Sequence, residues 1–106
     1  MTDSPLVLGI DLGTSGIRTA VVTGNGALLD SRSQTYGGAF SNPHSWREGC
    51  GDLIRAIPAQ LRCQLKALAV DGTSGTLLAC DRDGSPLGAA LAYSQSCPEL
   101  QSALQP

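Results

Sequence analysis

Apolar and polar residues alternate with a period of two in the N-terminal part of the chain, as in β-strands with one buried face. Two stretches of this kind, 6–12 and 17–23, are rich in Val, Ile and Leu and are predicted strands. A Gly-Asn-Gly sequence at 24–26 follows, and these residues tolerate the positive φ angles of tight turns. With a third strand expected from 27 to about 34, the chain is predicted to begin as an antiparallel three-strand meander.

A helical pattern replaces this alternation in the middle of the chain. Residues 35–43 are rich in Gly, Ser, Asn and Pro and are predicted to form a surface loop. Between 48 and 65 the apolar residues recur at helical spacing. Pro58 interrupts the pattern, and a proline inside a regular helix costs about 3 kcal/mol. We therefore expect either a helix kinked at Pro58 or two short helices, with Pro58 in the first turn of the second.

The pattern then returns to strands. Residues 67–71 (Ala-Leu-Ala-Val-Asp) form a short apolar run, typical of a parallel strand buried on both faces, and are expected to pair with the first strand. Residues 75–81 and 86–93 flank an Asp-Gly turn and are predicted to form a second hairpin. The predicted fold class is α/β, with a mixed sheet that contains the meander, a parallel strand and this further hairpin.

The first strand leads directly into the sequence Asp-Leu-Gly-Thr-Ser-Gly at 11–16. Glycines such as Gly13 let backbone amides turn toward an anion, while Thr14 and Ser15 add hydroxyl donors. Asp11 is placed to hold a divalent cation, directly or through water. These features predict a phosphate-binding loop. An ordinary hairpin turn, with Asp11 capping its own loop, is the structural alternative.

Neighbouring residues exclude two common phosphate motifs. Gly16 is followed by Ile17 and Arg18, so no G-x-x-x-x-G-K-[ST] motif is present, and no G-x-G-x-x-G motif opens a helix. The residues after the loop have a strand pattern, which excludes phosphate sites at a helix N-terminus. Arg18 either contacts a phosphate or remains solvated on the strand face that it shares with Ala20 and Val22.

A second polar sequence, Asp-Gly-Thr-Ser-Gly at 71–75, echoes the first. Each follows an apolar strand, and ligands of open α/β sheets bind at the carboxyl ends of the strands. Asp71, Thr73 and Ser74 are therefore candidate ligand-binding residues, with a satisfied buried turn as the alternative. We expect the two loops to meet at one edge of a cleft.

The composition and charge of the chain exclude some classes of binding partner. The chain has 106 residues, the size of one domain, with 42% hydrophobic residues and a formal net charge of -2. Its charged residues are scattered, which leaves no basic stripe for nucleic acid and no polybasic patch for a membrane. Small-molecule partners are therefore expected. A cytoplasmic location is also expected, because the N-terminus lacks the positive region of a signal peptide and no apolar run is long enough for a membrane span.

Four cysteines stand far apart in the sequence. Because no C-x-x-C pair is present, we expect neither a zinc site nor a disulfide framework. Free thiols, mostly buried or half-buried, are predicted at Cys50, Cys63, Cys80 and Cys97.

Three stretches, in this order, resemble the N-terminal portion of the FGGY carbohydrate kinases, the family of xylulokinase, ribulokinase and glycerol kinase. They are the loop and strands of 8–22, the sequence His44-Ser45-Trp46-Arg47-Glu48, and the strand, loop and hairpin of 65–93. The sequence Asp-Gly-Thr-Ser-Gly-Thr at 71–76 favours kinases of pentuloses such as ribulose or xylulose. The resemblance implies an RNase H-like, actin-like fold and ATP-dependent phosphorylation of a sugar.

The resemblance also implies roles for the candidate residues. ATP would be held through its phosphates by Gly13, Thr14, Ser15 and Arg18, with Mg²⁺ beside Asp11, and the sugar by Asp71, Thr73 and Ser74. The catalytic base of the family and its adenosine pocket are implied to lie beyond this chain. Residues 1–106 are therefore expected to be the N-terminal part of the first kinase domain, with the second domain absent and without activity alone.

Two other functions compete with this interpretation. One is a non-catalytic ligand-binding or self-associating module, with self-association through surface exposed by truncation. The other is an actin-like or Hsp70-like ATPase, which the order of the sequence at 46–48 and the second hairpin disfavours. His44 and Trp46 are either sugar-contacting residues or, for Trp46, a packing anchor for the following helix.

Overall fold

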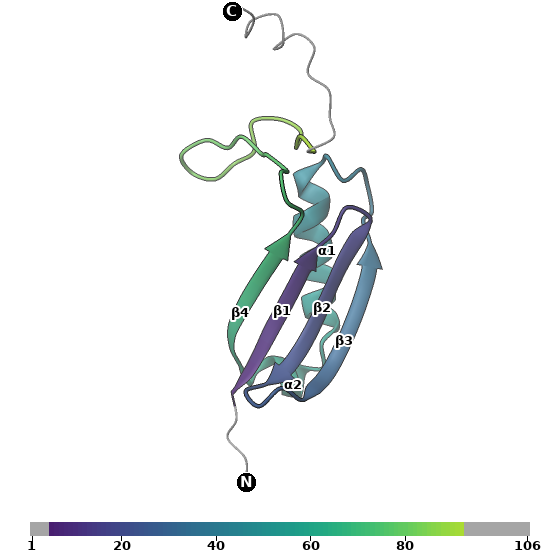
Figure 1. The fold of residues 1–106 in the computed structure, drawn as a ribbon, viewed down its shortest axis with the longest axis vertical. Coiled ribbons are helices and arrows are strands. Elements are labelled where there is room, and N and C mark those ends of the chain that lie inside the picture. The colour runs from purple at the N-terminus through teal and green to yellow at the C-terminus, as the bar shows by residue number, and fades with distance from the viewer. Residues whose placement is uncertain (1–4, 93–106) are drawn as a thin grey trace, which may run out of the picture.

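A computed structural model describes residues 5–92 as a four-stranded sheet with helices on one face (Figure 1). The strands lie in the order β3-β2-β1-β4. β1, β2 and β3 pair antiparallel, whereas β4 is parallel to β1. The predicted meander and the predicted parallel strand are both confirmed. The bounds of the strands are Leu6–Leu12 for β1, Gly16–Thr23 for β2, Leu28–Thr35 for β3 and Leu65–Gly72 for β4.

The predicted turn between β2 and β3 is present, but only one of its three residues, Gly26, has a positive φ. Gly26 has a φ of 94°, while Asn25 does not adopt a positive φ. The Thr23 N–H donates to the Ala27 carbonyl at 2.9 Å, and the Ala27 N–H donates to Thr23 Oγ1 at 2.9 Å. Glycine at position 26 therefore sets the register of β3 against β2.

Two helices replace the single long helical pattern: α1, Pro43–Ala56, and α2, Ala59–Arg62. The expected start at residue 48 is wrong, because Asn42 caps α1 by accepting the His44 N–H at 3.0 Å, and Pro43 suits the first helical position. Pro58 separates the helices as the N-cap of α2, one position before the predicted first turn. The expected end at residue 65 is also wrong, since Leu65 begins β4.

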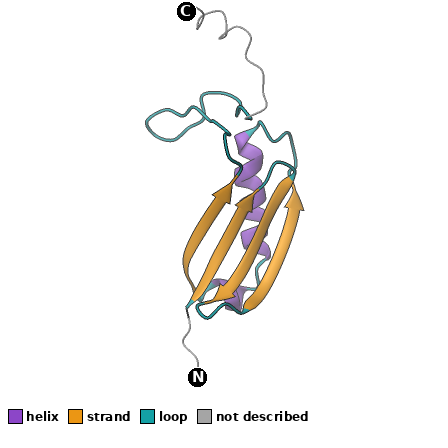
Figure 2. Ribbon diagram, viewed as in Figure 1, coloured by secondary structure: helices purple, strands orange, loops and turns teal. Residues whose placement is uncertain are grey.

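The core lies between α1 and the sheet. α1 packs against β2 and β3, behind the sheet in the view of Figure 2. Gly49 allows the close approach, because a Cβ at this position would lie 2.5 Å from Ile17 Cδ1. No helix among residues 5–92 is long and apolar enough to cross a membrane. The buried apolar cluster consists of Leu6, Leu8, Ile10, Ile17, Val21, Leu53 and Ile57.

β4 does not have the burial that its sequence predicts. Leu68 and Val70 are 60% and 56% exposed, so the expectation of a strand buried on both faces is wrong. β4 is an edge strand, and α1 covers β2 and β3 instead. The opposite face of the sheet carries no helix within the described part of the chain (Figure 2).

The chain follows the predicted second hairpin, but the two sides of this hairpin do not form regular strands. Its two sides meet in isolated bridges, Leu77 with Leu91 and Cys80 with Pro86, around a turn at Gly84, whose φ is 85°. It contacts the segment before α1 at Ala90, which is buried and donates its N–H to the Ser41 carbonyl at 2.7 Å. Tyr93, the predicted end of this hairpin, lies outside the described residues.

The described cysteines are free thiols, as expected. Their predicted burial is wrong for Cys63 and Cys80, which are exposed on α2's C-cap and on the second hairpin, while Cys50 is half-buried against the core. Cys97 lies outside the described residues.

Candidate functional site

Three connecting segments lie at the same end of the strands, at the top of Figure 1. They are the loop between β1 and β2, the segment from β3 to α1, and the loop that follows β4. Because β1 and β4 are parallel, Leu12 pairs with Gly72 and Asp11 pairs with Asp71. The two polar sequences of the chain therefore begin side by side.

The loop between β1 and β2 is a tight turn. The Gly13 N–H donates to the Gly16 carbonyl at 2.9 Å, and the Tyr36 hydroxyl donates to the Gly13 carbonyl at 2.6 Å. Thr14 and Ser15, at the tip, are exposed. The hydroxyl side chains at the tip of the loop therefore face solvent, while the hydrogen bonds of Gly13 hold the loop against the rest of the fold.

Neither glycine of this loop adopts a positive φ, and Gly16 is required for space. A Cβ at Gly16 would lie 2.5 Å from the Gln34 carbonyl oxygen, a contact that real Cβ atoms do not make. A Cβ at Gly13 would lie 3.1 Å from Arg18 Nη2.

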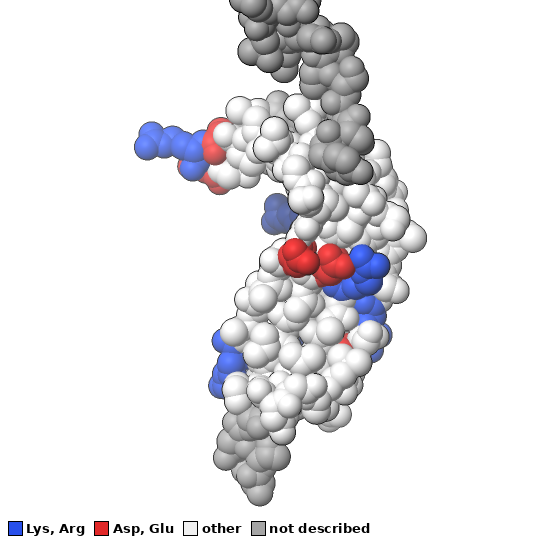
Figure 3. All heavy atoms as spheres, in the orientation of Figure 1, with Lys and Arg blue, Asp and Glu red and all other residues white. Residues whose placement is uncertain are grey.

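Asp11 and Arg18 face each other across β1 and β2. Arg18 Nη2 and Nε lie 2.7 Å and 2.9 Å from Asp11 Oδ2, and the two side chains are 43% (Asp11) and 64% (Arg18) exposed. The paired strands extend this contact into a row across the open face of the sheet, formed by Asp71, Asp11, Arg18 and Ser33. Figure 3 shows acidic and basic side chains side by side on this face.

A shallow hollow of about 650 Å³ lies along the same face. Small residues from neighbouring strands form its floor, among them Gly9, Ala20 and Ala69, which are partners in the sheet. Asp11, Arg18 and Asp71 line it as well. The charged row therefore borders a space large enough for a small molecule.

Asp11 is better suited to a metal ion that is bound together with a phosphate ligand than to a metal ion held by protein side chains alone. Among residues 5–92, no three His, Cys, Asp or Glu side chains are grouped to hold a metal ion. Mg²⁺ in nucleotide sites is usually held by one or two carboxylates together with phosphates and water. Asp11 Oδ1 takes no part in the contact with Arg18, which leaves this oxygen for such a role.

The loop after β4 divides the predicted sugar-contacting residues between two places. Asp71 lies in the charged row, and its Oδ1 accepts the Gly72 N–H at 2.9 Å. Thr73 instead lines a separate cavity of about 180 Å³, where its hydroxyl contacts the Thr76 hydroxyl. Ser74 is exposed and lines neither space. The structure therefore does not bring Asp71, Thr73 and Ser74 into one pocket.

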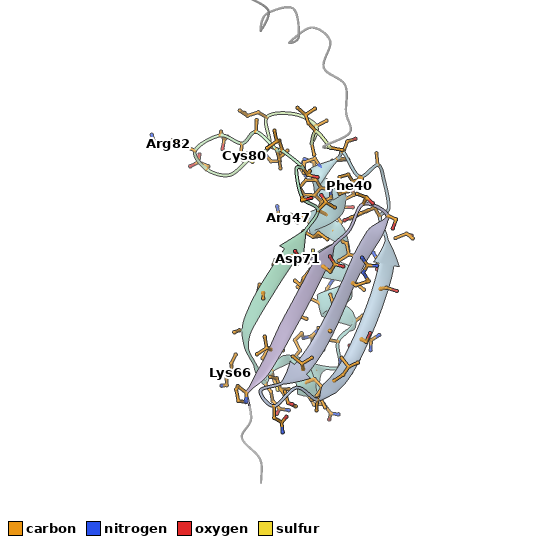
Figure 4. All side chains as sticks on the ribbon, in the orientation of Figure 1. Phe40, Arg47, Lys66, Asp71, Cys80 and Arg82 are labelled. Carbon is orange, nitrogen blue, oxygen red and sulfur yellow. The ribbon has the colours of Figure 1, made fainter. Side chains whose placement is uncertain are left out.

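Aromatic side chains form the other wall of the Thr73 cavity. Phe40 and Trp46 line it, with ring centroids 5.5 Å apart, and Trp46 Nε1 donates to the Phe40 carbonyl at 2.6 Å. Figure 4 shows Phe40 and Asp71 near the same end of the sheet. Trp46 thus packs at the start of α1 and also borders the cavity. His44 is exposed and lies outside this cavity.

Sequence reasoning missed Tyr36 and Phe40. The rings of these two residues lie 5.8 Å apart, and Tyr36 reaches the loop between β1 and β2. The available signal was two aromatic residues within a Gly-rich segment of a chain with only 4% aromatic residues. A loop of small residues needs such side chains to be anchored.

Burial raises the pKa of two groups, the Tyr36 hydroxyl at the loop and the Cys50 thiol of α1. It raises the pKa of the Tyr36 hydroxyl, with further increases from Cys50 and Asp11 against an opposing effect of Arg18. Tyr36 is therefore a hydrogen-bond donor at neutral pH. Burial also raises the pKa of the Cys50 thiol, which disfavours a nucleophilic thiolate at this position.

Comparison with known proteins gives the chain a context. No family model matches it. A xylulose kinase of Staphylococcus xylosus is 26% identical over 98 residues, which cover 85% of this chain and 20% of that protein. The chain thus spans about a fifth of the length of this curated relative.

Solved structures of sugar kinases share the fold. The xylulose kinase of Bifidobacterium adolescentis matches 96% of this chain and 20% of its own, with a TM-score of 0.71 and 20% identity. The glycerol kinase of Plasmodium falciparum, solved with ADP, matches 97% of this chain and 24% of its own, with a TM-score of 0.71 and 15% identity.

These matches confirm the expected fold class, an α/β fold with a mixed sheet that is consistent with an RNase H-like fold. The expected resemblance is also confirmed: in sequence and in fold, the chain is similar to the N-terminal part of the FGGY carbohydrate kinases.

Proposed function

We propose that the chain supplies the phosphate-binding edge of an ATP-dependent sugar kinase that acts on a pentulose such as xylulose or ribulose in the cytoplasm. One observation carries the proposal: the Asp11–Arg18 pair stands beside a tight glycine loop, at the sheet edge where the loop after β4 also begins. The relatives whose names include xylulose kinase support the choice of substrate class.

In this proposal the loop between β1 and β2 binds the β- and γ-phosphates of ATP. Backbone amides and the hydroxyls of Thr14 and Ser15 donate to phosphate oxygens, and Arg18 offers a fixed positive charge. Asp11 holds Mg²⁺ or one of its waters. When bound, the metal neutralises charge that develops on the transferred phosphoryl group.

The loop after β4 contributes to the sugar side. Thr73 and Thr76 place hydroxyls in a cavity walled by Phe40 and Trp46, and sugars bind well to hydroxyl donors beside aromatic rings. Asp71 and Ser74 are also proposed sugar contacts, from outside this cavity. The base that deprotonates the sugar belongs, by the family resemblance, to a later part of a kinase, so this chain alone is proposed to be inactive.

Nuclear magnetic resonance titration of the labelled 106-residue chain tests the proposal. We expect Mg·ATP to shift the amide signals of residues 11–18, and D-xylulose or D-ribulose to shift those of 71–76. Asp11→Asn should remove the magnesium-dependent part of the ATP shifts. Asp30→Asn is the matched control, because Asp30 also pairs with an arginine, Arg32, at 3.1 Å in the sheet but lies away from the loop.

Two results would contradict the proposal. One is the absence of ATP-induced shifts in residues 11–18, with shifts confined to other parts of the chain. The other is phosphorylation of a pentulose by the purified chain above background, which would overturn the proposed lack of activity.

A self-associating, non-catalytic module is the second candidate, and the exposed apolar side chains favour it. Leu68 and Val70 stand on the open edge strand β4, and Leu77 and Leu87 are each 68% exposed on the second hairpin. Unpaired strand edges and apolar patches are sites of association between chains. Light scattering over a range of concentrations tests this candidate, and a monomer at high concentration contradicts it.

A further inference from the structure

Tyr36 connects the loop between β1 and β2 with the segment that leads into α1. It follows β3 directly, and its hydroxyl donates to the Gly13 carbonyl at 2.6 Å across 23 positions of sequence. The side chain is half-buried and packs against the core cluster. The donor is therefore held by the fold and not by the loop that it contacts.

This hydrogen bond fixes the orientation of a peptide group at the tip of the loop. The Gly13 carbonyl and the Thr14 N–H belong to one peptide unit, and no described peptide bond is cis. In a trans peptide the carbonyl and the N–H point in opposite directions. Because Tyr36 holds the Gly13 carbonyl toward the protein, the Thr14 N–H is directed away from it, and no group within residues 5–92 accepts this N–H.

We propose that Tyr36 is a positioning residue of the phosphate loop, which aims the Thr14 N–H at an incoming phosphate. This inference rests on the proposed function of the loop. Tyr36 does not touch the ligand in this arrangement; it acts through the Gly13–Thr14 peptide. A backbone donor aligned before binding adds affinity because no freedom is lost when the anion arrives.

The surroundings of Tyr36 suit such a role. Its ring lies 5.8 Å from that of Phe40, which in turn packs on Trp46 at the start of α1. Trp46 Nε1 also donates to the Phe40 carbonyl at 2.6 Å, which holds Phe40 against the start of α1. The phenol therefore has a rigid support on the side opposite to the loop.

Tyr36→Phe tests the inference, because it removes only the hydroxyl and keeps the ring in place. Ser45→Ala is the matched control, since it removes another hydroxyl that donates to backbone carbonyls in the same segment without contacting the loop. In the labelled chain we would record the Gly13 carbonyl ¹³C shift, the Thr14 amide signal and the affinity for inorganic pyrophosphate.

Tyr36→Phe should change the Gly13 and Thr14 signals and weaken pyrophosphate binding roughly threefold to tenfold, the effect of losing one hydrogen bond. Ser45→Ala should leave the signals and the affinity as in the wild type, because the Ser45 hydroxyl contacts neither Tyr36 nor the loop. Gly13 and Thr14 signals that are unchanged by Tyr36→Phe, or changed equally by both substitutions, would overturn the inference.

The two proposals fail in different ways. If the wild-type chain does not bind pyrophosphate, the phosphate function of the loop is refuted, and with it the ligand-directed part of this inference. The carbonyl and amide signals then still decide whether Tyr36 orients the peptide. If pyrophosphate binds and Tyr36→Phe binds it as tightly as the wild type, the positioning role alone is refuted.

Discussion

Arg18 places two of its guanidinium nitrogens on a single carboxylate oxygen of Asp11, at 2.7 Å and 2.9 Å from Oδ2. This geometry leaves Oδ1 of Asp11 outside the contact. A cation bound through Oδ1 is compatible with the ion pair, whereas a cation that needs both oxygens must displace Arg18. The pair therefore restricts how a metal can approach the loop.

Asp11→Asn should affect binding far more than stability. The Asp11 and Arg18 side chains are 43% and 64% exposed, and exposed ion pairs contribute between 0 and about 1 kcal/mol. We expect urea unfolding to show a loss of less than about 1 kcal/mol. ATP affinity with and without Mg²⁺, measured by calorimetry, should differ in the wild-type chain and become equal in the variant. A variant that keeps the magnesium dependence contradicts the role of Asp11.

Gly16→Ala should destabilise the chain by about 1–3 kcal/mol, the usual cost of a side chain forced into filled space. The added Cβ would meet the Gln34 carbonyl oxygen at 2.5 Å, and a backbone atom cannot move aside cheaply. Gly37→Ala is the control, because no atom lies within 4 Å of a Cβ at that position. Equal midpoints of urea unfolding for the two variants would show that the close approach is not real.

Thr73→Val should weaken pentulose binding more than Ser74→Ala does. Thr73 lines the cavity with Trp46, whereas Ser74 is exposed and lies outside it. Valine keeps the shape of threonine and removes the hydroxyl, so we expect a loss of roughly threefold to tenfold in affinity. Titration of both variants with D-xylulose measures this difference, and a larger effect of Ser74→Ala would move the sugar site to the outer face of the loop.

The raised pKa of Tyr36 predicts a stability change at alkaline pH. Burial keeps the folded hydroxyl protonated above its ordinary pKa of 10.0, where the unfolded chain already ionises. The stabilisation is fully present below pH 10.0 and is lost as the pH rises through the raised value. Unfolding free energies of the wild type and Tyr36→Phe should therefore converge over this range. Cys50, whose pKa is also raised, is common to both chains and cancels in the difference.

Leu68→Lys should reduce any self-association of the chain. Leu68 is 60% exposed on the edge strand β4, and a charge on an edge strand opposes pairing with another chain. Leu28→Lys is matched to it, because Leu28 is 61% exposed on β3 at the other edge of the sheet. Sedimentation velocity should show a smaller mass for Leu68→Lys alone, and the same effect of both substitutions would exclude β4 as the specific contact.

Local patterns predict the strands of this fold well and the burial of β4 poorly. β1 coincides with its predicted range, because its alternating residues face α1 on one side. The apolar residues of β4 have the composition of a buried strand, yet burial depends on which elements cover it, and α1 lies over β2 and β3. Such coverage is a property of distant residues that a local pattern does not contain.

The residues of the candidate site were likewise predictable only where a local sequence pattern places them. Asp11 and Asp71 are found from sequence because each ends an apolar strand, and parallel pairing places them together. Their separation from Thr73 is not predictable, since it depends on the direction of the loop after β4. Tyr36 was missed because its contact with Gly13 spans 23 positions and has no motif.

The neighbouring aromatic rings of Tyr36, Phe40 and Trp46 give the molecule a built-in optical probe. Trp46 is the single tryptophan of the chain. Its ring lies next to that of Phe40, which lies next to that of Tyr36, and the Tyr36 hydroxyl donates to the Gly13 carbonyl. Its fluorescence therefore reports on events at the β1–β2 loop without any attached dye. Ligands that rearrange the loop can be detected in unlabelled protein from the emission of this one indole.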